Sequence, residues 1–287
     1  MAGVEGIIGE VQPAEDPPTD PRFQSGPVPA IILADAAVPL GIQWGCRSMT
    51  LEVLQNYRQI DAARRELQDK GLSALDSLPR SLLRRLKLVR GVRVGDRLKS
   101  WDVLETLKFI ERQLDRQDPI LDIGSYSSEI IVALHKSGYR RLTGVDLNPG
   151  LKSMPFADSI HYEVGNFLKV PAADGSFKAI TAISVIEHGF DGPALCREMS
   201  RLLMKGGYLI VSFDYWPDKV DTSGIRIFDM TWTLFSKQDV LGFIEEAGRH
   251  GLAPTGDLRF DAQEAPIAFG GKRYTFAWLT LKKTNPS

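Results

Sequence analysis

The stretch I-L-D-I-G-S-Y-S-S-E at residues 120–129 decides how the rest of this chain is organised. An apolar run leads to an acid, Asp122, and to Gly124, and small residues then make a bend before a helix-like run. The pattern predicts a buried parallel strand that turns tightly into a helix, with Ser127 or Ser128 as the N-cap. In an open α/β sheet such a turn lies at the carboxyl end of a central strand, where ligands bind. We therefore expect a cofactor at this turn.

The composition of the chain excludes several broad classes of protein. Its 287 residues suffice for one large α/β domain with an appendage, and 43% of them are hydrophobic, so a sizeable core is available. The net charge of −1 argues against a nucleic-acid binder. Cys46 and Cys196 lie far apart without metal-ligand spacing, which predicts two idle thiols in a reducing compartment. Without a basic leader or a sufficiently long apolar run, we expect a cytoplasmic protein with no membrane span.

Three regions are expected along the chain. Residues 1–30 hold six prolines, together with five acids against one base, which predicts a disordered tail. Residues 31–100 are expected to form an N-terminal helical extension or cap. Residues 101–287 are expected to form the main α/β domain, which opens with an amphipathic helix.

Helical patterns within the extension cover residues 50–70 and 81–89, and Ser100 is expected to cap the helix that follows. Between residues 80 and 99 the sequence has eight bases against one acid, Asp96. This basic segment has two interpretations. It is either a solvated helix face whose long side chains cover apolar surface, or an anion site for a phosphate-bearing or acidic acceptor.

Strand and helix patterns alternate beyond residue 100, which is typical of a parallel sheet. Besides the strand at residue 120, the expected strands cover residues 141–145, 161–164, 177–183, 208–213 and 273–281. A helix is expected at residues 194–204. Ser236 and Asp239 have the spacing of a capping box, which predicts a helix that runs from there to about residue 250.

Polar residues follow the predicted strands at the edge where the turn lies. Asp146 ends the second strand, 22 residues after the glycine of the turn, a spacing at which a carboxylate reaches the ribose of an adenosine-type cofactor. Asn166 and Phe167 follow the third strand, and Glu187 and His188 follow the fourth. This combination indicates a cofactor site more specifically than the glycine bend alone.

Several motifs now resemble those of the class I S-adenosylmethionine-dependent methyltransferases, in particular the type 11-like group that acts on small molecules. That group has a central segment similar to P-F-P-D-G-S-F-D, and residues 170–178 read V-P-A-A-D-G-S-F-K. The likeness extends over residues 101–287 and includes S-V-I-E-H at 184–188, R-L-L-M-K-G-G-Y-L-I-V at 201–211 and Y-T-F-A-W-L-T-L-K-K at 274–283. The resemblance implies an α/β, Rossmann-like fold with a seven-stranded sheet whose last strand is antiparallel, and S-adenosyl-L-methionine as the cofactor.

The resemblance also assigns cofactor-binding residues. They are Asp122, Gly124, Ser125, Tyr126 and Ser128 in the turn, Asp146 at the ribose with Leu147 beside the adenine, Asn166 at the adenine edge with Phe167, and Ser184 with Val185 after the fourth strand. The chain departs from the family at Tyr126 and Ser128, where glycines are usual, and at Asn166, where an acid is usual. A phenol at position 126 must point away from the cofactor or cover it. Asn166 can still accept a hydrogen bond through its carbonyl oxygen.

The acceptor is expected at the ends of the fourth and fifth strands. His188 is either a general base or a wall of the pocket, and a nearby carboxylate such as Glu187 or Asp214 is expected to raise its pKa. Asp214 is the second catalytic candidate, while Tyr215 and Trp216 can stack on a sugar or another ring.

The leading hypothesis is O-methylation of a small or saccharide-like acceptor, anionic if the basic segment contacts it. Three alternatives stay open: a natural-product N- or O-methyltransferase, a nicotinamide-dependent oxidoreductase, and a non-catalytic partner protein with this fold. The oxidoreductase would use G-x-G-x-x-G, and residues 124–129 lack its second and third glycines. The sequence leaves the identity of the acceptor and the oligomeric state open.

Overall fold

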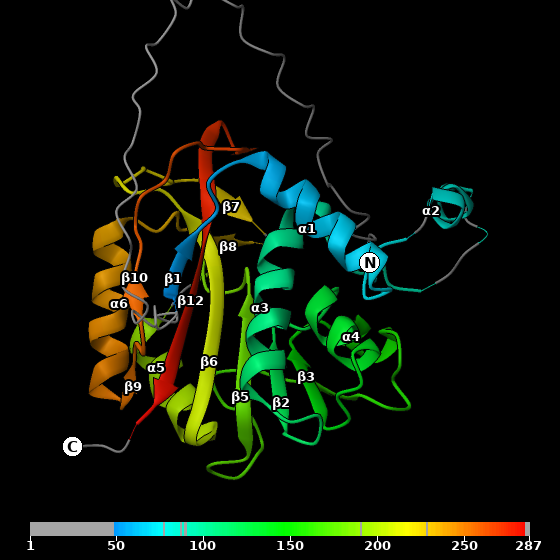
Figure 1. Ribbon diagram of the computed structural model, residues 1–287, viewed down its shortest axis with the longest axis horizontal. Helices are drawn as coiled ribbons and strands as arrows, with labels where there is room; N and C mark the ends of the chain where they lie inside the picture. Colours follow the sequence, from blue (N-terminus) through cyan, green and yellow to red (C-terminus); the bar gives the residue numbers. More distant parts are fainter. Residues whose placement is uncertain are drawn as a thin grey trace, which may run out of the picture. The chain divides into compact units, whose positions relative to one another are not determined.

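Alternating apolar residues build a long central sheet that is buried on both faces (Figure 1). The structure is a computed structural model, and it describes residues 49–76, 78–86, 88, 91–189, 191–227 and 229–284. In the strand that ends at Tyr215, Tyr208 and Ile210 pack into the core on one face, and Leu209 and Val211 pack on the other. The tail predicted for residues 1–30, and also Cys46, lie outside the described residues.

The parallel part of the sheet confirms the predicted α/β, Rossmann-like fold. Its strands lie in the order β4 (His161–Val164), β3 (Leu142–Asp146), β2 (Ile120–Ile123), β5 (Phe177–Ile183) and β6 (Leu203–Tyr215). Each neighbouring pair in this series is parallel. From β2 the chain adds β3 and β4 on one side, and it then returns to add β5 and β6 on the other side. The strand order therefore reverses between β2 and β5. The carboxyl ends of β2 and β5 therefore flank the point where ligands bind in such sheets.

The last strand, β12 (Lys272–Lys283), is antiparallel to β6, as the resemblance implies. Its other edge is shared by three short strands: β9 (Leu252–Ala253), β1 (Met49–Val53) and β11 (Ile267–Phe269). β10 (Asp257–Leu258) adds to β1, and the sheet of the described chain has ten strands, not the expected seven. β7 (Arg226–Ile227) and β8 (Met230–Thr231) form a separate pair.

Helices cover both faces of the sheet. The core on one face includes residues of α1 (Tyr57–Asp69), α3 (Ser100–Gln113) and α4 (Glu129–Lys136), and that on the other includes α5 (Gly192–Leu202) and α6 (Lys237–Arg249). The remaining helical elements are α2 (Leu78–Arg85), η1 (Arg97–Lys99) and η2 (Pro149–Ser153). Ser236 and Asp239 form the predicted capping box at the start of α6. Among the described residues, no helix has both the length and the apolar character needed to cross a membrane.

Three sequence predictions about local structure were wrong. The first residues of the helical pattern at 50–70 form β1, because Leu51 and Val53 are buried and pair with β12, and a short apolar run does not distinguish strand from helix. The strand expected from Tyr208 begins at Leu203, with two glycines inside it. Ser100 is the first residue of α3 and not its cap, since its backbone is already helical (φ −61°, ψ −36°); its Oγ accepts a hydrogen bond from Arg64 Nε at 2.8 Å.

Candidate active site

The turn between β2 and α4 requires glycine at position 124. Gly124 has φ +67°, a left-handed conformation that side chains disfavour, and a Cβ placed there would lie 2.4 Å from Cγ2 of Val185. The next amide, on Ser125, donates to the carbonyl of Val145 at 3.2 Å and ties the turn to β3. The turn is therefore in close contact with β3 and with the segment that follows β5, as the predicted cofactor site requires.

Asp146, at the end of β3, is oriented by two backbone amides. Its Oδ2 accepts a hydrogen bond from the amide of Tyr126 at 3.0 Å, and its Oδ1 accepts one from the amide of Asn148 at 2.8 Å. An ionised carboxylate has about four lone-pair sites, so each oxygen can still accept a ribose hydroxyl. The structure thus brings the predicted ribose acid into direct contact with the turn.

Asp122 lies beneath the turn and not at its surface. It is buried, and its Oδ1 accepts a hydrogen bond from Thr181 Oγ1 at 2.7 Å. Burial raises the pKa of Asp122 to about 6, against the effect of hydrogen bonding by Thr181, Ser125 and Ser128. Among the described residues, no group lies at ordinary hydrogen-bond geometry to Oδ2 of Asp122. Ser125 and Ser128 are nevertheless near enough to lower the pKa of Asp122. We infer that Asp122 supports the shape of the turn.

Tyr126 stands where the family has a glycine, and its ring packs on η2. A Cβ added to Gly150 would lie 2.9 Å from Cε2 of Tyr126, so the ring and this backbone are in tight contact. The ring is also packed against the core on the α3 and α4 face. Ser128 is the N-cap of α4, as predicted, but its side chain makes no capping hydrogen bond.

The segment after β5 contains an unused polar group. Ser184 has φ +54°, and its buried Oγ has no hydrogen-bond partner among the described residues. Leu147, beyond Asp146, exposes 64% of its surface although it is apolar. An unsatisfied hydroxyl, an exposed leucine and an oriented carboxylate near one turn fit an adenosine-type cofactor. Asn166, by contrast, is exposed and its Oδ1 accepts from the amide of Leu168 at 2.9 Å, while Phe167 packs towards the α5 and α6 face.

An ion pair fastens the N-terminal extension to this site. Arg64 of α1 donates from Nη1 and Nη2 to the two carboxylate oxygens of Glu129 at 2.9 and 2.7 Å, and both side chains are buried. Glu129 also accepts from the amide of Ala74 at 2.8 Å, and it is the first residue of the helix that follows the turn. The amide of Gly95 donates to the carbonyl of Ser127 at 2.8 Å. The extension therefore holds the turn in place, which the sequence did not indicate.

On the expected acceptor side, Asp214 is buried near the end of β6, and both of its carboxylate oxygens have partners. Lys99 Nζ lies 3.3 Å from its Oδ1, and Trp232 Nε1 donates to its Oδ2 at 2.8 Å. Burial raises the pKa of Tyr274, and hydrogen bonding between its hydroxyl and Asp214 acts in the same direction. Asp214 is thus held in place from three sides of the fold.

Two further buried carboxyls lie close to Asp214. Glu187 is 1% exposed, and burial, reinforced by the charge of Asp214, raises its pKa to about 8 against the influence of Lys99. Asp102 of α3 is fully buried, and burial raises its pKa to about 6, although Lys99 and a hydrogen bond from Ser212 Oγ at 2.8 Å oppose this. At neutral pH, Glu187 is therefore mainly protonated.

His188 is half-buried beside this acidic cluster. Burial lowers its pKa below the usual value; the charge of Asp214 acts in the opposite direction, and that of Lys99 adds to the lowering. The expectation that a nearby carboxylate raises the pKa of His188 was therefore wrong, because desolvation of the charged form outweighs the carboxylate. A neutral imidazole at pH 7 is the form that can accept a proton.

Other residues near the acceptor side also differ from expectation. Tyr215 cannot stack on a ligand, since it is fully buried and its hydroxyl donates to the carbonyl of Phe260 at 2.8 Å. Lys99 and Arg97 of the basic segment pair with Asp214 and Asp61, and Arg84 pairs with Asp76. The sequence indicated Glu187 only as a neighbour of His188. Sequence reasoning missed Asp102, Trp232 and Tyr274, because only the fold brings them together.

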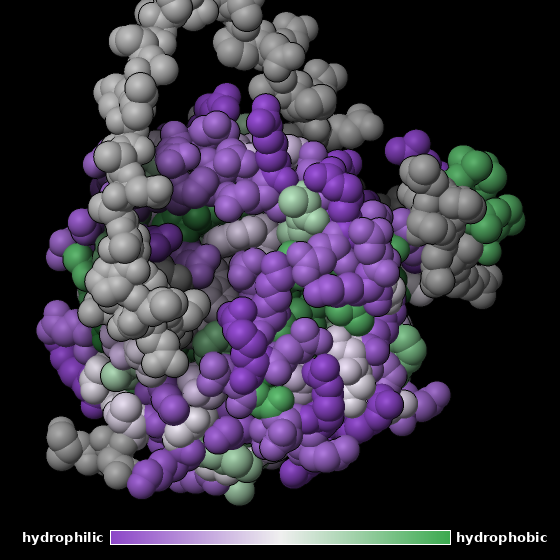
Figure 2. All heavy atoms as spheres, viewed as in Figure 1, coloured by the Kyte–Doolittle hydropathy of each residue, from purple (hydrophilic) through white to green (hydrophobic). Residues whose placement is uncertain are grey.

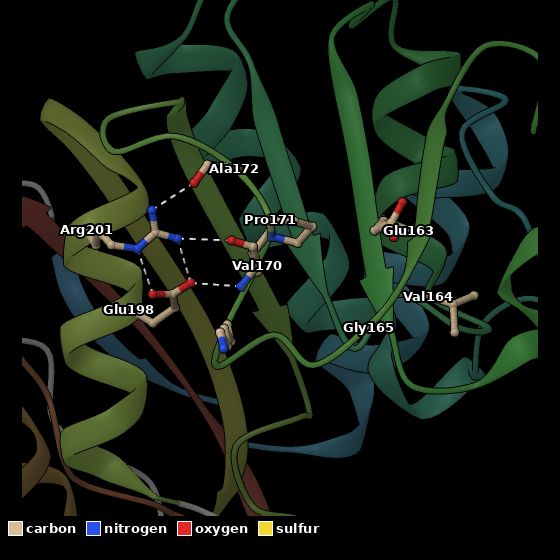
Figure 3. A pocket seen from close by; sticks show the side chains of 9 residues that line it. Glu163, Val164, Gly165, Val170, Pro171, Ala172, Glu198 and Arg201 are labelled. Atoms are coloured by element: carbon tan, nitrogen blue, oxygen red, sulfur yellow. Dashed lines mark hydrogen bonds and ion pairs between the residues drawn. The ribbon is translucent and has the colours of Figure 1, made fainter.

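A cavity of ≈570 Å³ lies between the loop after β4 and α5 (Figure 3). It forms where the connection from β4 to β5 contains no helix. Arg201 and Glu198 of α5 face this loop, and the guanidinium is fully used by Glu198, Asp174 and the carbonyls of Val170 and Ala172. The lining contains none of the predicted cofactor or acceptor residues, so the cavity does not mark either site.

A family model described as a methyltransferase domain matches residues 121–211. A demethylmenaquinone methyltransferase of Mycolicibacterium vanbaalenii is 30% identical over 99 residues, which are 34% of this chain and 43% of the relative. The chain therefore matches less than half of that relative's length.

Solved structures of methyltransferases are similar to the chain with TM-scores just below 0.5. A 1,6-didemethyltoxoflavin-N1-methyltransferase of Burkholderia thailandensis is 14% identical, with a TM-score of 0.49. The match covers 64% of this chain and 79% of the chain of that methyltransferase. A geranyl diphosphate C-methyltransferase of Streptomyces coelicolor is 15% identical, with a TM-score of 0.48. The match covers 80% of this chain and 98% of the chain of that methyltransferase.

The family match falls on the part of the chain that was described above. Residues 121–211 begin at β2, include the turn, Asp146 and the segment after β5, and end within β6. The match confirms the family that the sequence motifs resemble. Residues 121–211 of this chain thus match a methyltransferase domain.

Proposed function

We propose that this protein transfers a methyl group from S-adenosylmethionine to a hydroxyl of a small, saccharide-like acceptor. When bound, the cofactor supplies an electrophilic methyl group. The carboxylate of Asp146 would accept hydrogen bonds from its ribose, Leu147 would contact the adenine, and the hydroxyl of Ser184 would gain a partner. The amides at the start of α4 add the positive end of a helix dipole.

The acceptor side supplies the proton chemistry that a hydroxyl needs. His188 is neutral at pH 7, and its Nδ1 is buried, so Nε2 would take the proton of the hydroxyl. The hydroxyl oxygen would bond to the methyl carbon as the carbon–sulfur bond breaks, and a neutral thioether would leave. Asp214 stabilises the imidazolium that forms, because its negative charge raises the pKa of His188. Methyl transfer is an in-line displacement, so the main task of the remaining residues is alignment and exclusion of water.

The observation that carries this proposal is the neutral His188 beside the buried Asp214. Asp214 and Asp146 both lie where their strands end, at the same edge of the sheet. An amine acceptor that is already neutral needs no such base. Tyr215 no longer supports a saccharide-like acceptor, because its hydroxyl is used inside the fold. Arg84, Arg97 and Lys99 no longer support an anionic acceptor, because each has a carboxylate partner. Those two properties rest on the sequence resemblance and on the rest of the basic segment.

A second candidate is favoured by the relative described above. Its name states that it acts on demethylmenaquinone, and we propose a ring acceptor of that kind as the alternative. The two candidates differ in the atom that receives the methyl group, oxygen in the first and, in the second, an atom of the ring system.

The experiment is a transfer assay with methyl-labelled S-adenosylmethionine and separate pools of saccharides, phenols, amines and demethylmenaquinone. The product is identified by mass spectrometry and by the chemical shift of the labelled methyl group. Label in an ether, with transfer abolished in His188→Ala, supports the first candidate. Label on nitrogen or carbon contradicts it, and label in the demethylmenaquinone pool supports the second.

A further inference from the structure

A group of exposed leucines is concentrated in and just after α2. Ten large apolar side chains are exposed in the described chain, and four of them lie within seven consecutive residues. These are Leu82, Leu83, Leu86 and Leu88, with exposures of 59%, 41%, 60% and 69%, which we call the leucine patch. Figure 1 shows α2 standing out from the rest of the fold, beyond the end of α1, and Figure 2 shows apolar side chains on its outer side. Clustered exposure of this kind marks an interaction surface.

The orientation of α2 is determined by Arg84. Its Nε lies 2.6 Å from Oδ2 of Asp76, and its Nη1 donates to the carbonyl of Gly91 at 2.7 Å. Arg84 therefore joins the two ends of residues 76–91, the segment that we call the excursion. On a helix, Leu82 and Leu86 share one face and position 84 lies on roughly the opposite face. With Arg84 directed to the base of the excursion, the leucine patch must face outward.

The sequence around the leucine patch is strongly basic. Residues 79–93 contain six bases and no acid, in a chain whose net charge is −1. Those bases are Arg80, Arg84, Arg85, Lys87, Arg90 and Arg93. Arg84 has a carboxylate partner, whereas Arg85 is exposed in the last turn of α2 beside the leucines. The excursion thus combines apolar side chains that point outward with a strong positive charge.

We propose that this excursion docks the protein on the surface of an anionic phospholipid membrane. A basic amphipathic helix lies in the membrane interface, with its leucines among the acyl chains and its bases at the phosphates. A second copy of the chain fits less well, because a symmetric contact would bring two sets of six bases together. The attachment is peripheral, since no helix among the described residues can cross a membrane. The proposal is independent of the acceptor and the cofactor.

The test is sedimentation of the full chain with vesicles, without cofactor or acceptor. Phosphatidylcholine vesicles are compared with an equal mixture of phosphatidylcholine and phosphatidylglycerol. The parent is expected to bind the anionic vesicles and not the neutral ones, and added salt should weaken this binding. Equal binding to both vesicles, or no binding to either, would overturn the proposal.

Variants separate the two components of the surface. The double substitution Leu82→Ser with Leu86→Ser should lower the partition coefficient about tenfold or more, because each leucine loses its transfer from water. Arg85→Gln should lower it about fivefold. Leu241→Ser on α6 and Arg58→Gln on α1 remove an exposed leucine and an exposed base elsewhere, and should have no effect.

Two measurements exclude other occupants of the leucine patch. Melting temperature and S-adenosylhomocysteine affinity should be the same in the parent and the double leucine variant, which shows that both are folded. Gel filtration then gives the oligomeric state. If the double variant turns an oligomer into a monomer, or if it binds anionic vesicles like the parent, the patch is not a membrane surface.

Discussion

Lys99 Nζ lies 3.3 Å from Oδ1 of Asp214 and 3.3 Å from the ring centroid of Phe276. Lys99 ends the short helix that precedes α3, whereas Asp214 lies near the end of β6 and Phe276 on β12. Burial lowers the pKa of Lys99, but Asp214, Asp102 and Glu187 outweigh this, and the pKa is raised. The amino-terminal part of the chain therefore supplies a positive charge to the carboxyls on the acceptor side.

Removal of this charge should destabilise the fold. Lys99→Met leaves Asp214 buried without its cation, which typically costs about 3 kcal/mol or more in the free energy of unfolding. Lys108→Met is the matched control, since Lys108 and Glu66 form a more exposed pair, worth less than about 1 kcal/mol. Urea unfolding of both variants at neutral pH measures the difference. Equal losses would show that Lys99 contributes no more than a surface lysine.

Glu187 should make the protein less stable as the pH rises. Its pKa is raised from 4.5 to about 8, so between these values the folded state binds more protons than the unfolded state. The stabilisation is complete below pH 4.5 and is lost as the pH rises through about 8. Each pKa unit corresponds to about 1.4 kcal/mol.

Glu187→Gln tests this dependence, because glutamine keeps the shape and cannot ionise. Between about pH 6.5 and 8.5 the free energy of unfolding should fall in the parent and stay nearly level in the variant. Asp102 and Asp122 titrate near pH 6 and act mainly below this range. Parallel curves for parent and variant would mean that Glu187 is already ionised in the folded protein.

The buried acidic cluster illustrates what the sequence could and could not indicate. β4 and β5 have the bounds that the sequence predicts, and Asp146 is at the predicted strand end, because these features depend on local sequence. The acceptor side instead combines residues 99, 102, 187, 214, 232 and 274, which are neighbours only in the folded chain. The direction of the pKa shift of His188 depends on how deeply the fold buries it, and no local pattern reports that.

Truncation of His188 should separate catalysis from binding. His188→Ala should lower turnover about 100-fold or more, because general-base catalysis contributes about 10² to 10⁴. Affinity for S-adenosylhomocysteine should change little. The parent rate should rise through a transition below the usual histidine pKa of 6.5, since burial lowers that pKa, and the variant should lack it. If only the acceptor KM changes and the pH profile persists, His188 is a pocket wall and Asp214→Asn becomes the next test.

Tyr126 tests the departure from the usual glycine turn. Tyr126→Gly removes a ring that packs on Gly150 and the core, and should lower the free energy of unfolding by about 2 kcal/mol or more. Cofactor affinity should fall as well, because the amide at 126 orients Asp146 and the turn becomes looser. Tyr126→Phe is the control, with both quantities close to those of the parent. Tighter cofactor binding by Tyr126→Gly would show that the phenol obstructs the site.

The central claim is that the turn after β2 and Asp146 hold S-adenosylmethionine. Isothermal titration with S-adenosylhomocysteine tests it directly in the parent, in Asp146→Ala and in Asp158→Ala, which removes an exposed acid from the nearby loop. We predict that the parent binds, that Asp158→Ala binds equally, and that Asp146→Ala binds about tenfold or more weakly, because a charge-assisted hydrogen bond is worth about 1.5–3 kcal/mol. No binding by the parent, or unchanged affinity in a folded Asp146→Ala variant, would contradict the account.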